Sequence, residues 1–206
     1  DSFSPSLDRA RPLKGFFLNL QSTHNPHLEQ QLHQLEWQFH ALSKKLHNES
    51  GAEKFLVYFQ SFTNTYAPLE TLKALYEKAL SFENVVGLSI GTRSDSITDE
   101  TMAYLAELSK KTEIWVEFGI QSIYDETLKR INRGHDSANV KEAICKAKSY
   151  GLNVCGHLIF GLPGETKEMM LETAKEAYAL GVDSVKYHPL YVVRRTALAN
   201  EYARGE

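Results

Sequence analysis

Three ionisable residues lie inside apolar stretches of the sequence, where a charge is costly to bury. Glu117 stands in IWVEFGI, His157 in NVCGHLIF and Lys186 in VDSVKYH. Burying such groups costs on the order of several kcal/mol unless each one is paired or bound to a ligand. The sequence therefore predicts a shared polar cavity. Two alternatives stay open: Glu117 and Lys186 simply form an ion pair, and His157 is a core histidine with satisfied hydrogen bonds.

Further polar residues follow these stretches and two earlier ones. Because ligands of parallel α/β proteins bind at the carboxyl ends of the strands, we expect these residues on one rim of a sheet. The basic turn 130–133 either is solvated surface or places a guanidinium on a ligand carboxylate. The candidates are Thr63, Asn64, Thr92, Arg93, Gln121, Arg133, Gly161 and His188.

The chain has two cysteines, Cys145 and Cys155. Their spacing fits neither a CxxC pair nor a zinc site, and two cysteines exclude a disulfide framework. We expect two buried, reduced core thiols in a cytoplasmic protein, and no metal site. The motifs GxGxxG, GxxxxGK[ST], HExxH and GxSxG are absent, so dinucleotide dehydrogenases, P-loop NTPases, zincins and serine hydrolases lose support.

The composition is that of one large globular domain. The 206 residues are 42% hydrophobic and 24% charged, which excludes collagen-like and disordered classes. The net charge of −3 gives no reason to expect nucleic-acid or membrane binding. No apolar run approaches the ~18 residues of a membrane span. The sequence begins with Asp1 rather than methionine, so we expect a processed or truncated chain.

A repeating pattern of strands and helices must position the polar residues. Proline and glycine predict an irregular segment over 1–24, and apolar residues at steps of three and four predict a long helix over 27–47. Residues 1–53 thus precede the repeating part, 54–206, within one domain. There we predict strands at 54–60, 85–91, 114–120, 153–160 and 182–188, with helices at 68–80, 98–110, 124–131, 137–150 and 165–180.

The spacing of these elements predicts an α/β fold. Strands recur about every 30 residues, the length of a parallel crossover unit. Their near-continuous apolar character suits a parallel sheet. A closed eight-stranded barrel needs about 250 residues, so the five predicted strands form either a partial barrel or a doubly wound sheet.

Several motifs occur together in an order that resembles the radical S-adenosylmethionine (SAM) superfamily. EFGIQS (117–122), LKRINRGH (128–135) and HLIFGLPGE (157–165) carry the resemblance. The subgroup is similar to that of the oxygen-independent coproporphyrinogen oxidases and the catalytic subunit of Elongator. The YhcC-like branch also shares YFQ (58–60), GTRSD (91–95) and KYHPL (186–190). The resemblance covers residues 54–206.

The resemblance implies a partial (βα)6 barrel of which this chain carries strands two to six, with the first strand missing. It implies SAM, a [4Fe–4S] cluster held by a CxxxCxxC loop, reductive cleavage of SAM to a 5′-deoxyadenosyl radical, and a reductant such as flavodoxin or ferredoxin. CxxxCxxC is absent, and Cys145 and Cys155 cannot replace it. We therefore expect a fragment that holds no cluster and is inactive alone, and an enzyme in full-length form.

The resemblance also implies roles for single residues. Thr63 and Asn64 match positions that contact the methionyl end of SAM. Thr92 falls near the ribose and carboxylate, and Glu117 and Gln121 face the sugar and methionine.

Arg133 matches an arginine that meets the SAM carboxylate. His157 faces the ribose at a position that is often acidic in relatives, and Gly161 begins a segment that lies against adenine. The possible substrate contacts are Arg93, Lys186 and His188.

Two other functions stay open. One is a degenerate barrel that binds SAM or a partner without catalysis. The other is a lyase that uses Lys186 as a Schiff-base amine activated by burial. The sequence does not name a substrate: RNA modification, porphyrin chemistry and small-metabolite chemistry all stay open.

Overall fold

The computed structural model describes residues 16–18, 27–60 and 63–205, which build a six-stranded parallel sheet with the strand order β1-β2-β3-β4-β5-β6. The strands are β1 (Phe16–Leu18), β2 (Phe55–Phe59), β3 (Val85–Thr92), β4 (Glu113–Gln121), β5 (Asn153–Phe160) and β6 (Ser184–Pro189). The helices are α1 (Leu28–Ser50), α2 (Leu69–Leu80), α3 (Asp99–Ser109), α4 (Asp125–Arg130), α5 (Ser137–Ser149), α6 (Lys167–Ala179) and α7 (Ala197–Arg204).

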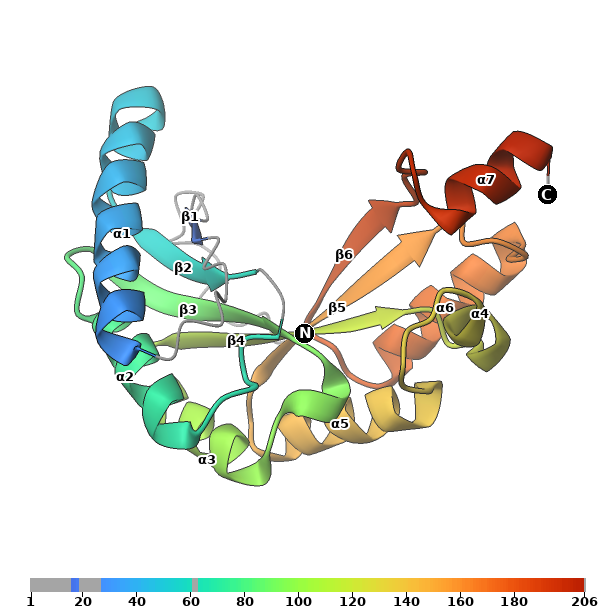
Figure 1. Cartoon of the computed structure of the whole chain (residues 1–206). Coiled ribbons are helices and arrows are strands. Elements are labelled where there is room, and N and C mark those ends of the chain that lie inside the picture. The colour runs from blue at the N-terminus through green and yellow to red at the C-terminus, as the bar shows by residue number, and fades with distance from the viewer. Residues whose placement is uncertain (1–15, 19–26, 61–62, 206) are drawn as a thin grey trace, which may run out of the picture.

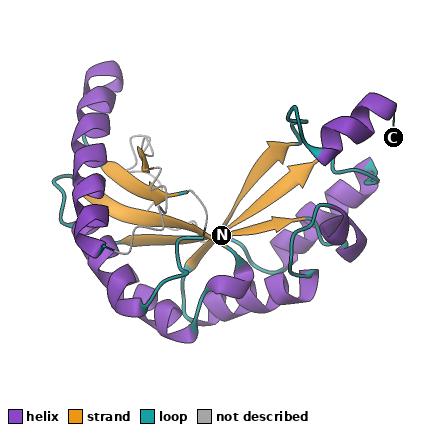
Figure 2. Ribbon diagram, in the orientation of Figure 1, coloured by secondary structure: helices purple, strands orange, loops and turns teal. Residues whose placement is uncertain are grey.

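The sheet curls into an open half-barrel, with the strands on the inside and the helices along the outer, convex side (Figures 1 and 2). Each strand is joined to its neighbour by a segment that contains at least one helix, which is the connection that adjacent parallel strands require. β1 and β6 are the two edges of the sheet.

The helices cover the apolar side of the strands. Leu88 and Ile90 of β3 and Val116 and Phe118 of β4 are fully buried in one core with Leu105 of α3. Because side chains alternate along a strand, the intervening residues face the concave side of the half-barrel. On these two strands they are Gly87, Ser89, Gly91, Trp115, Glu117 and Gly119.

The long helix α1 extends this core beside β2. Its residues Leu35 and Phe39 are buried. The ring of Phe39 stacks on Phe82 at 4.3 Å between centroids and meets Phe55 edge-on at 6.0 Å. Among the described residues, no helix is both long and apolar enough to cross a membrane.

The predicted α/β half-barrel is confirmed, and all five predicted strands are present. Thr98 caps α3, since its hydroxyl accepts a hydrogen bond from the amide of Thr101. The prediction of an irregular segment over 1–24 is wrong at β1, which pairs with β2 and adds a sixth strand at the edge of the sheet. A strand of three residues is too short to show an alternating pattern. The other residues of that segment lie outside the described ranges.

Three further details differ from the sequence analysis. Cys145 is exposed rather than buried, because α5 turns Ala143, Ile144 and Ala147 toward the core and leaves Cys145 on the outer face. α6 begins at Lys167 after a Thr166 cap, so residues 165 and 166 lie in the preceding turn. α7 was not predicted.

Candidate active site

The parallel register brings the polar residues of neighbouring strands abreast on the concave face. Glu117 of β4 pairs with Cys155 of β5. Two residues further along the strands, Gly119 of β4 pairs with His157 of β5, which in turn pairs with Lys186 of β6. Directly paired residues point to the same side of a sheet. The polar residues that interrupt the apolar strands therefore converge, as the sequence predicted.

The carboxylate of Glu117, only 4% exposed, is the centre of this cluster. It accepts hydrogen bonds from Tyr58 at 2.7 Å and from Ser89, it lies 2.6 Å from His157 Nε2, and Lys186 Nζ is 2.7 Å from both of its oxygens. Burial alone raises the pKa of Glu117, but the hydrogen bonds outweigh burial and hold this pKa at about 2. Glu117 is therefore a carboxylate at neutral pH, with its acceptor capacity used by the protein.

Lys186 is the counter-ion of this carboxylate. Its ammonium also lies 4.1 Å from the centroid of the Tyr58 ring, a cation–π distance. Burial, together with the hydrogen bond to Glu117, raises the pKa of Tyr58 far above its usual value, so Tyr58 is a neutral donor. The alternative that Glu117 and Lys186 form an ion pair is thus confirmed, within a larger network.

Two histidines extend the cluster toward solvent. His188 Nε2 lies 3.1 Å from His157 Nδ1, and the two rings stack at 5.1 Å between centroids. His157 is partly buried, whereas His188 is exposed. Both ring nitrogens of His157 thus face protein partners, so a ligand that contacts either nitrogen must displace one of them.

A second polar pair lies beside Gly119, near the carboxyl end of β4. A Cβ atom at this position would collide with the guanidinium of Arg133 and lie 2.6 Å from Nε2 of Gln121. A side chain at this position would therefore shift the ends of both side chains from their present positions. Gln121 itself has a φ of 64°, and the pairing of β4 with β5 shifts register between Gly119 and Gln121. A non-glycine residue held in this region stores strain, which is common at binding sites.

This pair contains buried polar atoms that lack hydrogen-bond partners within the described ranges. In the pair, these atoms are Gln121 Oε1, an acceptor, and Arg133 Nε, a donor. Outside the pair, Nε2 of His135 is likewise buried without a partner in the described residues. Arg133 Nη2 does donate to the carbonyl of Gly119 at 3.2 Å. Unsatisfied buried groups are rare because they lose their bonds to water. A ligand that carries both a donor and an acceptor would satisfy the first two atoms.

Arg93 forms an ion pair with Asp95. Its Nε and Nη2 donate to the two carboxylate oxygens of Asp95 at 2.8 and 2.5 Å. These bonds hold the pKa of Asp95 at about 2. Burial, and then the charge of Arg93, lower the pKa of Arg133. A substrate contact by Arg93 stays a prediction, and Asp95 is the partner that the sequence analysis did not assign.

The remaining predicted residues lie at strand ends, where they bind the backbone or each other. Asn64 Nδ2 donates to the carbonyls of Phe59 and Gly91, each at 2.9 Å. The hydroxyl of Thr92 is 2.6 Å from that of Thr65. Thr63 is half-buried, and Gly161 has a φ of 88° in the turn after β5. These contacts join strands or shape turns, and the ligand roles of Thr63, Asn64, Thr92 and Gly161 stay predictions.

Two members of the central cluster, Tyr58 and Ser89, were not predicted. Both occupy concave-face positions, and Tyr58 pairs directly with Ser89 across β2 and β3. The signal that could have identified them is a hydroxyl group within each of two apolar strands, FLVYF and VVGLSIGT. A neutral hydroxyl costs less to bury than a charge and so is less conspicuous in a sequence.

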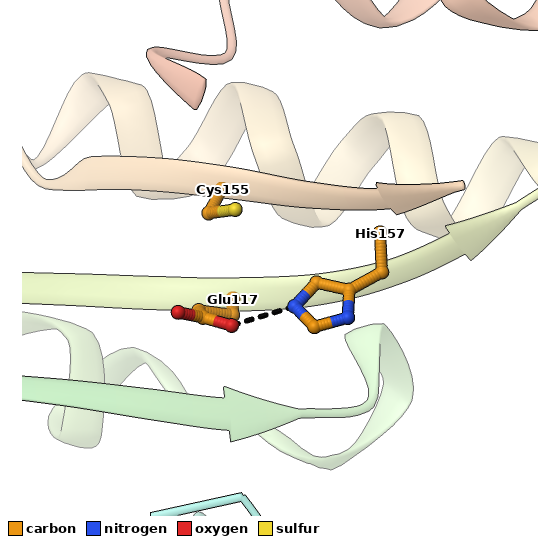
Figure 3. Close-up of side chains that lie close together, drawn as sticks. All are labelled: Glu117, Cys155 and His157. Atoms are coloured by element: carbon orange, nitrogen blue, oxygen red, sulfur yellow. Dashed lines mark hydrogen bonds and ion pairs between the residues drawn. The ribbon is translucent and has the colours of Figure 1, made fainter. Parts of the chain in front are cut away.

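Glu117, Cys155 and His157 each offer a ligand atom within 4.8 Å of the others (Figure 3). Their chemistry opposes a metal ion. The ammonium of Lys186 already lies against both oxygens of Glu117. Burial, followed by the charge of Glu117, raises the pKa of Cys155 to about 11, whereas a metal requires the thiolate. We assign no metal to this group.

Comparison with known proteins gives consistent matches. The model of the radical SAM superfamily matches residues 40–177. An uncharacterized Bacillus subtilis protein, YtqA, is 41% identical over 169 residues, which cover 82% of this chain and 52% of that protein. Escherichia coli YhcC is 41% identical over 155 residues, covering 75% of this chain and 50% of that protein. The chain spans about half the length of these relatives.

Solved structures share the half-barrel. The archaeal Elp3 protein of Methanocaldococcus infernus matches with a TM-score of 0.66 and 25% identity, covering 93% of this chain and 48% of that one. Coproporphyrinogen III oxidase of Escherichia coli, described as a radical SAM enzyme, matches with a TM-score of 0.56 and 18% identity, covering 79% and 39%. The predicted relation to YhcC and to the Elongator subunit Elp3 is confirmed, and the coproporphyrinogen oxidase shares the fold.

Proposed function

Because this chain belongs to the radical SAM superfamily, we propose that the full-length protein is an enzyme that binds SAM on the concave face of the half-barrel. In this proposal SAM and a [4Fe–4S] cluster supply the radical chemistry when bound, and the barrel supplies binding, orientation and exclusion of water. The match over residues 40–177 supports the family chemistry. The substrate is not specified by it.

The observation that carries the proposal is the unsatisfied pair beside Gly119. Gln121 Oε1 is a buried acceptor and Arg133 Nε a buried donor, and neither has a partner in the described part of the chain. The methionyl part of SAM carries an ammonium and a carboxylate, which complement these two atoms. Gly119 lets the Arg133 guanidinium and the Gln121 amide lie against the backbone of β4. These three residues therefore fit the amino-acid end of the ligand, in agreement with the roles expected for Gln121 and Arg133.

The cysteines of this chain do not provide the ligands of a [4Fe–4S] cluster. Radical SAM chemistry needs three thiolates that leave one iron site open, and the 206 residues contain two cysteines. One is exposed on α5 and the other is buried in β5. We therefore derive no step through the cluster from these residues. A low-potential reductant such as flavodoxin or ferredoxin belongs to the same proposal.

The structure gives no support to the Schiff-base alternative. Lys186 Nζ donates to both oxygens of Glu117 at 2.7 Å. The nitrogen that would have to attack a carbonyl is thus engaged as a hydrogen-bonded ammonium. The degenerate-barrel alternative differs from the proposal only in catalysis, so an experiment must measure binding and cleavage separately.

The test uses the full-length protein, loaded anaerobically with iron and sulfide. We expect it to bind SAM and, when reduced, to release 5′-deoxyadenosine, which chromatography detects. Arg133→Met should weaken SAM binding about 10- to 100-fold, the range for losing a charged hydrogen bond. Arg130→Met is the matched control, since Arg130 lies nearby but pairs with Glu201.

The outcomes are distinct. SAM binding without 5′-deoxyadenosine in the reduced, cluster-loaded protein would favour the degenerate barrel. Equal SAM affinities of the Arg133→Met, Arg130→Met and wild-type proteins would overturn the placement of the ligand beside Gly119.

A further inference from the structure

The concave face holds a second arrangement that SAM binding does not explain. His188, His157 and Glu117 form a continuous chain of contacts from the exposed rim to the buried carboxylate, with distances of 3.1 and 2.6 Å. The three residues come from three adjacent strands, β6, β5 and β4. We define this set as the His–His–Glu chain.

The donor and acceptor roles along the chain follow from its buried end. Glu117 is ionised and can only accept, so Nε2 of His157 carries a proton and donates it. In the neutral ring, Nδ1 of His157 is then an acceptor, and Nε2 of His188 must donate to it. Neutral His188 is left with an unprotonated Nδ1 that has no hydrogen-bond partner within residues 27–60 and 63–205. This nitrogen is a free base at the exposed end of the chain.

We infer that His188 is the proton acceptor of this site, positioned by His157 and Glu117, and that it takes a proton from a weakly acidic O–H or N–H group of the substrate. The O–H or N–H bond breaks and its electron pair stays on the substrate. A new N–H bond forms at Nδ1 of His188, which becomes an imidazolium. Its Nε2 proton can shift to Nδ1 of His157, whose Nε2–H still faces the Glu117 carboxylate. No oxidant or reductant is required.

The charges around His188 favour this direction of transfer. The groups that face the histidine pair are Lys186 on the same strand, Glu117 on β4, Cys155 on β5 and Tyr58 on β2. Lys186 and Glu117 cancel, while Tyr58 and Cys155 are neutral because burial raises their pKa values. Desolvation, followed by the charge that His157 carries when it is protonated and by the charge of Lys186, lowers the pKa of His188. His188 is therefore unprotonated at neutral pH and available as a base.

The position of Lys186 indicates which class of substrate the site would accept. Two of its three N–H donors are used by Glu117. Lys186 and His188 are two residues apart on β6 and point to the same side. The Lys186 ammonium also lies against the Tyr58 ring, so His188 supplies the free acceptor while Lys186 supplies positive charge on the same face. This arrangement suits a weakly acidic O–H group, such as an enol or a phenol, and it suits the resulting anion.

The inference rests on the proposed function only in placing a substrate on the concave face. Its test needs neither SAM nor the cluster, so its failure is distinct from failure of the proposed function. Long-range ¹H–¹⁵N spectra of the labelled 206-residue chain report the protonation of each ring nitrogen. Above the titration midpoint we expect Nδ1 of both rings unprotonated. Both rings should then respond to one shared proton with one common midpoint, because the two sites are coupled.

Glu117→Gln should lower this midpoint by about one to three pH units, since the cationic pair loses its carboxylate and faces an uncompensated Lys186. Glu113→Gln is the matched control, because Glu113 is exposed on the same strand, and it should leave the midpoint unchanged. The exposed His33 of α1 is an internal reference. Should Glu117→Gln fail to fold, Lys186→Met keeps the His–His–Glu chain but removes a positive charge that lowers the pKa of His188, and it should raise the midpoint of His188.

Diethyl pyrocarbonate, which acylates accessible unprotonated imidazole nitrogens, tests whether the base is open to a ligand. Mass spectrometry should find His188 modified at a rate that rises through the same midpoint, and His157 protected. A His188 with Nδ1 protonated in the neutral state, separate midpoints for the two rings, or equal protection of both from the reagent would overturn the inference.

Discussion

Replacing Glu117 by glutamine is expected to destabilise the chain by about 3 kcal/mol at pH 7. The magnitude follows from the pKa of Glu117, which is lowered from 4.5 to about 2 by its partners in the folded state. At about 1.4 kcal/mol per pH unit this difference corresponds to roughly 3 kcal/mol. A lowered pKa stabilises the fold above the pKa of the unfolded chain, and the contribution is lost as the pH falls through the folded value. Glutamine also places an amide donor where Tyr58, Ser89 and Lys186 donate.

Urea unfolding followed by tryptophan fluorescence measures the effect. The gap between wild type and Glu117→Gln should shrink from about 3 kcal/mol at pH 7 to roughly 1.5 kcal/mol at pH 3, because a protonated Glu117 loses its advantage over glutamine. The slope of the unfolding free energy against urea concentration should be the same for both proteins, which identifies a change in stability rather than in the compactness of the unfolded state. Glu113→Gln, on the exposed part of β4, should stay within about 0.5 kcal/mol of wild type at each pH. A gap below about 1 kcal/mol at pH 7, or one that does not narrow in acid, would refute the reasoning.

Two further predictions concern groups near the network. Gly119→Ala should weaken SAM binding to the full-length protein at least as much as Arg133→Met, measured by calorimetry, because its methyl group occupies space taken by Arg133 and Gln121; unchanged affinity would show that this space is not used. Native protein should react with Ellman's reagent at one thiol, the exposed Cys145, and at a second, Cys155, only after unfolding in urea; two fast thiols in the native protein would contradict the burial of Cys155.

The cluster around Glu117 could be predicted because two simple rules determine it. Charged residues inside apolar strands must find partners, and parallel register sets strand neighbours abreast. Glu117, His157 and Lys186 break the apolar pattern of three adjacent strands, so their convergence follows once the strand order is known. The hydroxyls of Tyr58 and Ser89 break the same pattern less visibly, and their part in the network emerges only from the structure.

The arrangement of Gln121 and Arg133 beside Gly119 could not be predicted from the residues themselves. It depends on a register shift at the end of β4, on a left-handed backbone at Gln121 and on the return of Arg133 from beyond α4. None of these three features has a local sequence signature. Glutamine in particular rarely adopts a positive φ, so nothing in the sequence indicates the backbone conformation of Gln121. The resemblance to a family indicated these two residues, whereas their unsatisfied atoms became visible only in the folded chain. The strand ends show the opposite case, in which the sequence indicates a ligand contact but the structure shows bonds within the protein. Asn64 donates to a backbone carbonyl, and the hydroxyl of Thr92 meets that of Thr65.

The two subsites share a boundary, and this has a consequence for chemistry. Gly119, which lies against the ends of Gln121 and Arg133, is the direct strand partner of His157. In our proposal, a ligand bound by Arg133 and Gln121 would therefore lie next to the ring that orients His188. On the inner side, Glu117 and Lys186 compensate each other and fix the network in place; on the outer side, His188 retains an uncommitted nitrogen. The concave face therefore combines a charge-balanced ion pair, Glu117 and Lys186, with His188, the group that we propose changes its protonation, and His188 lies beside the Gln121–Arg133 pair rather than within it.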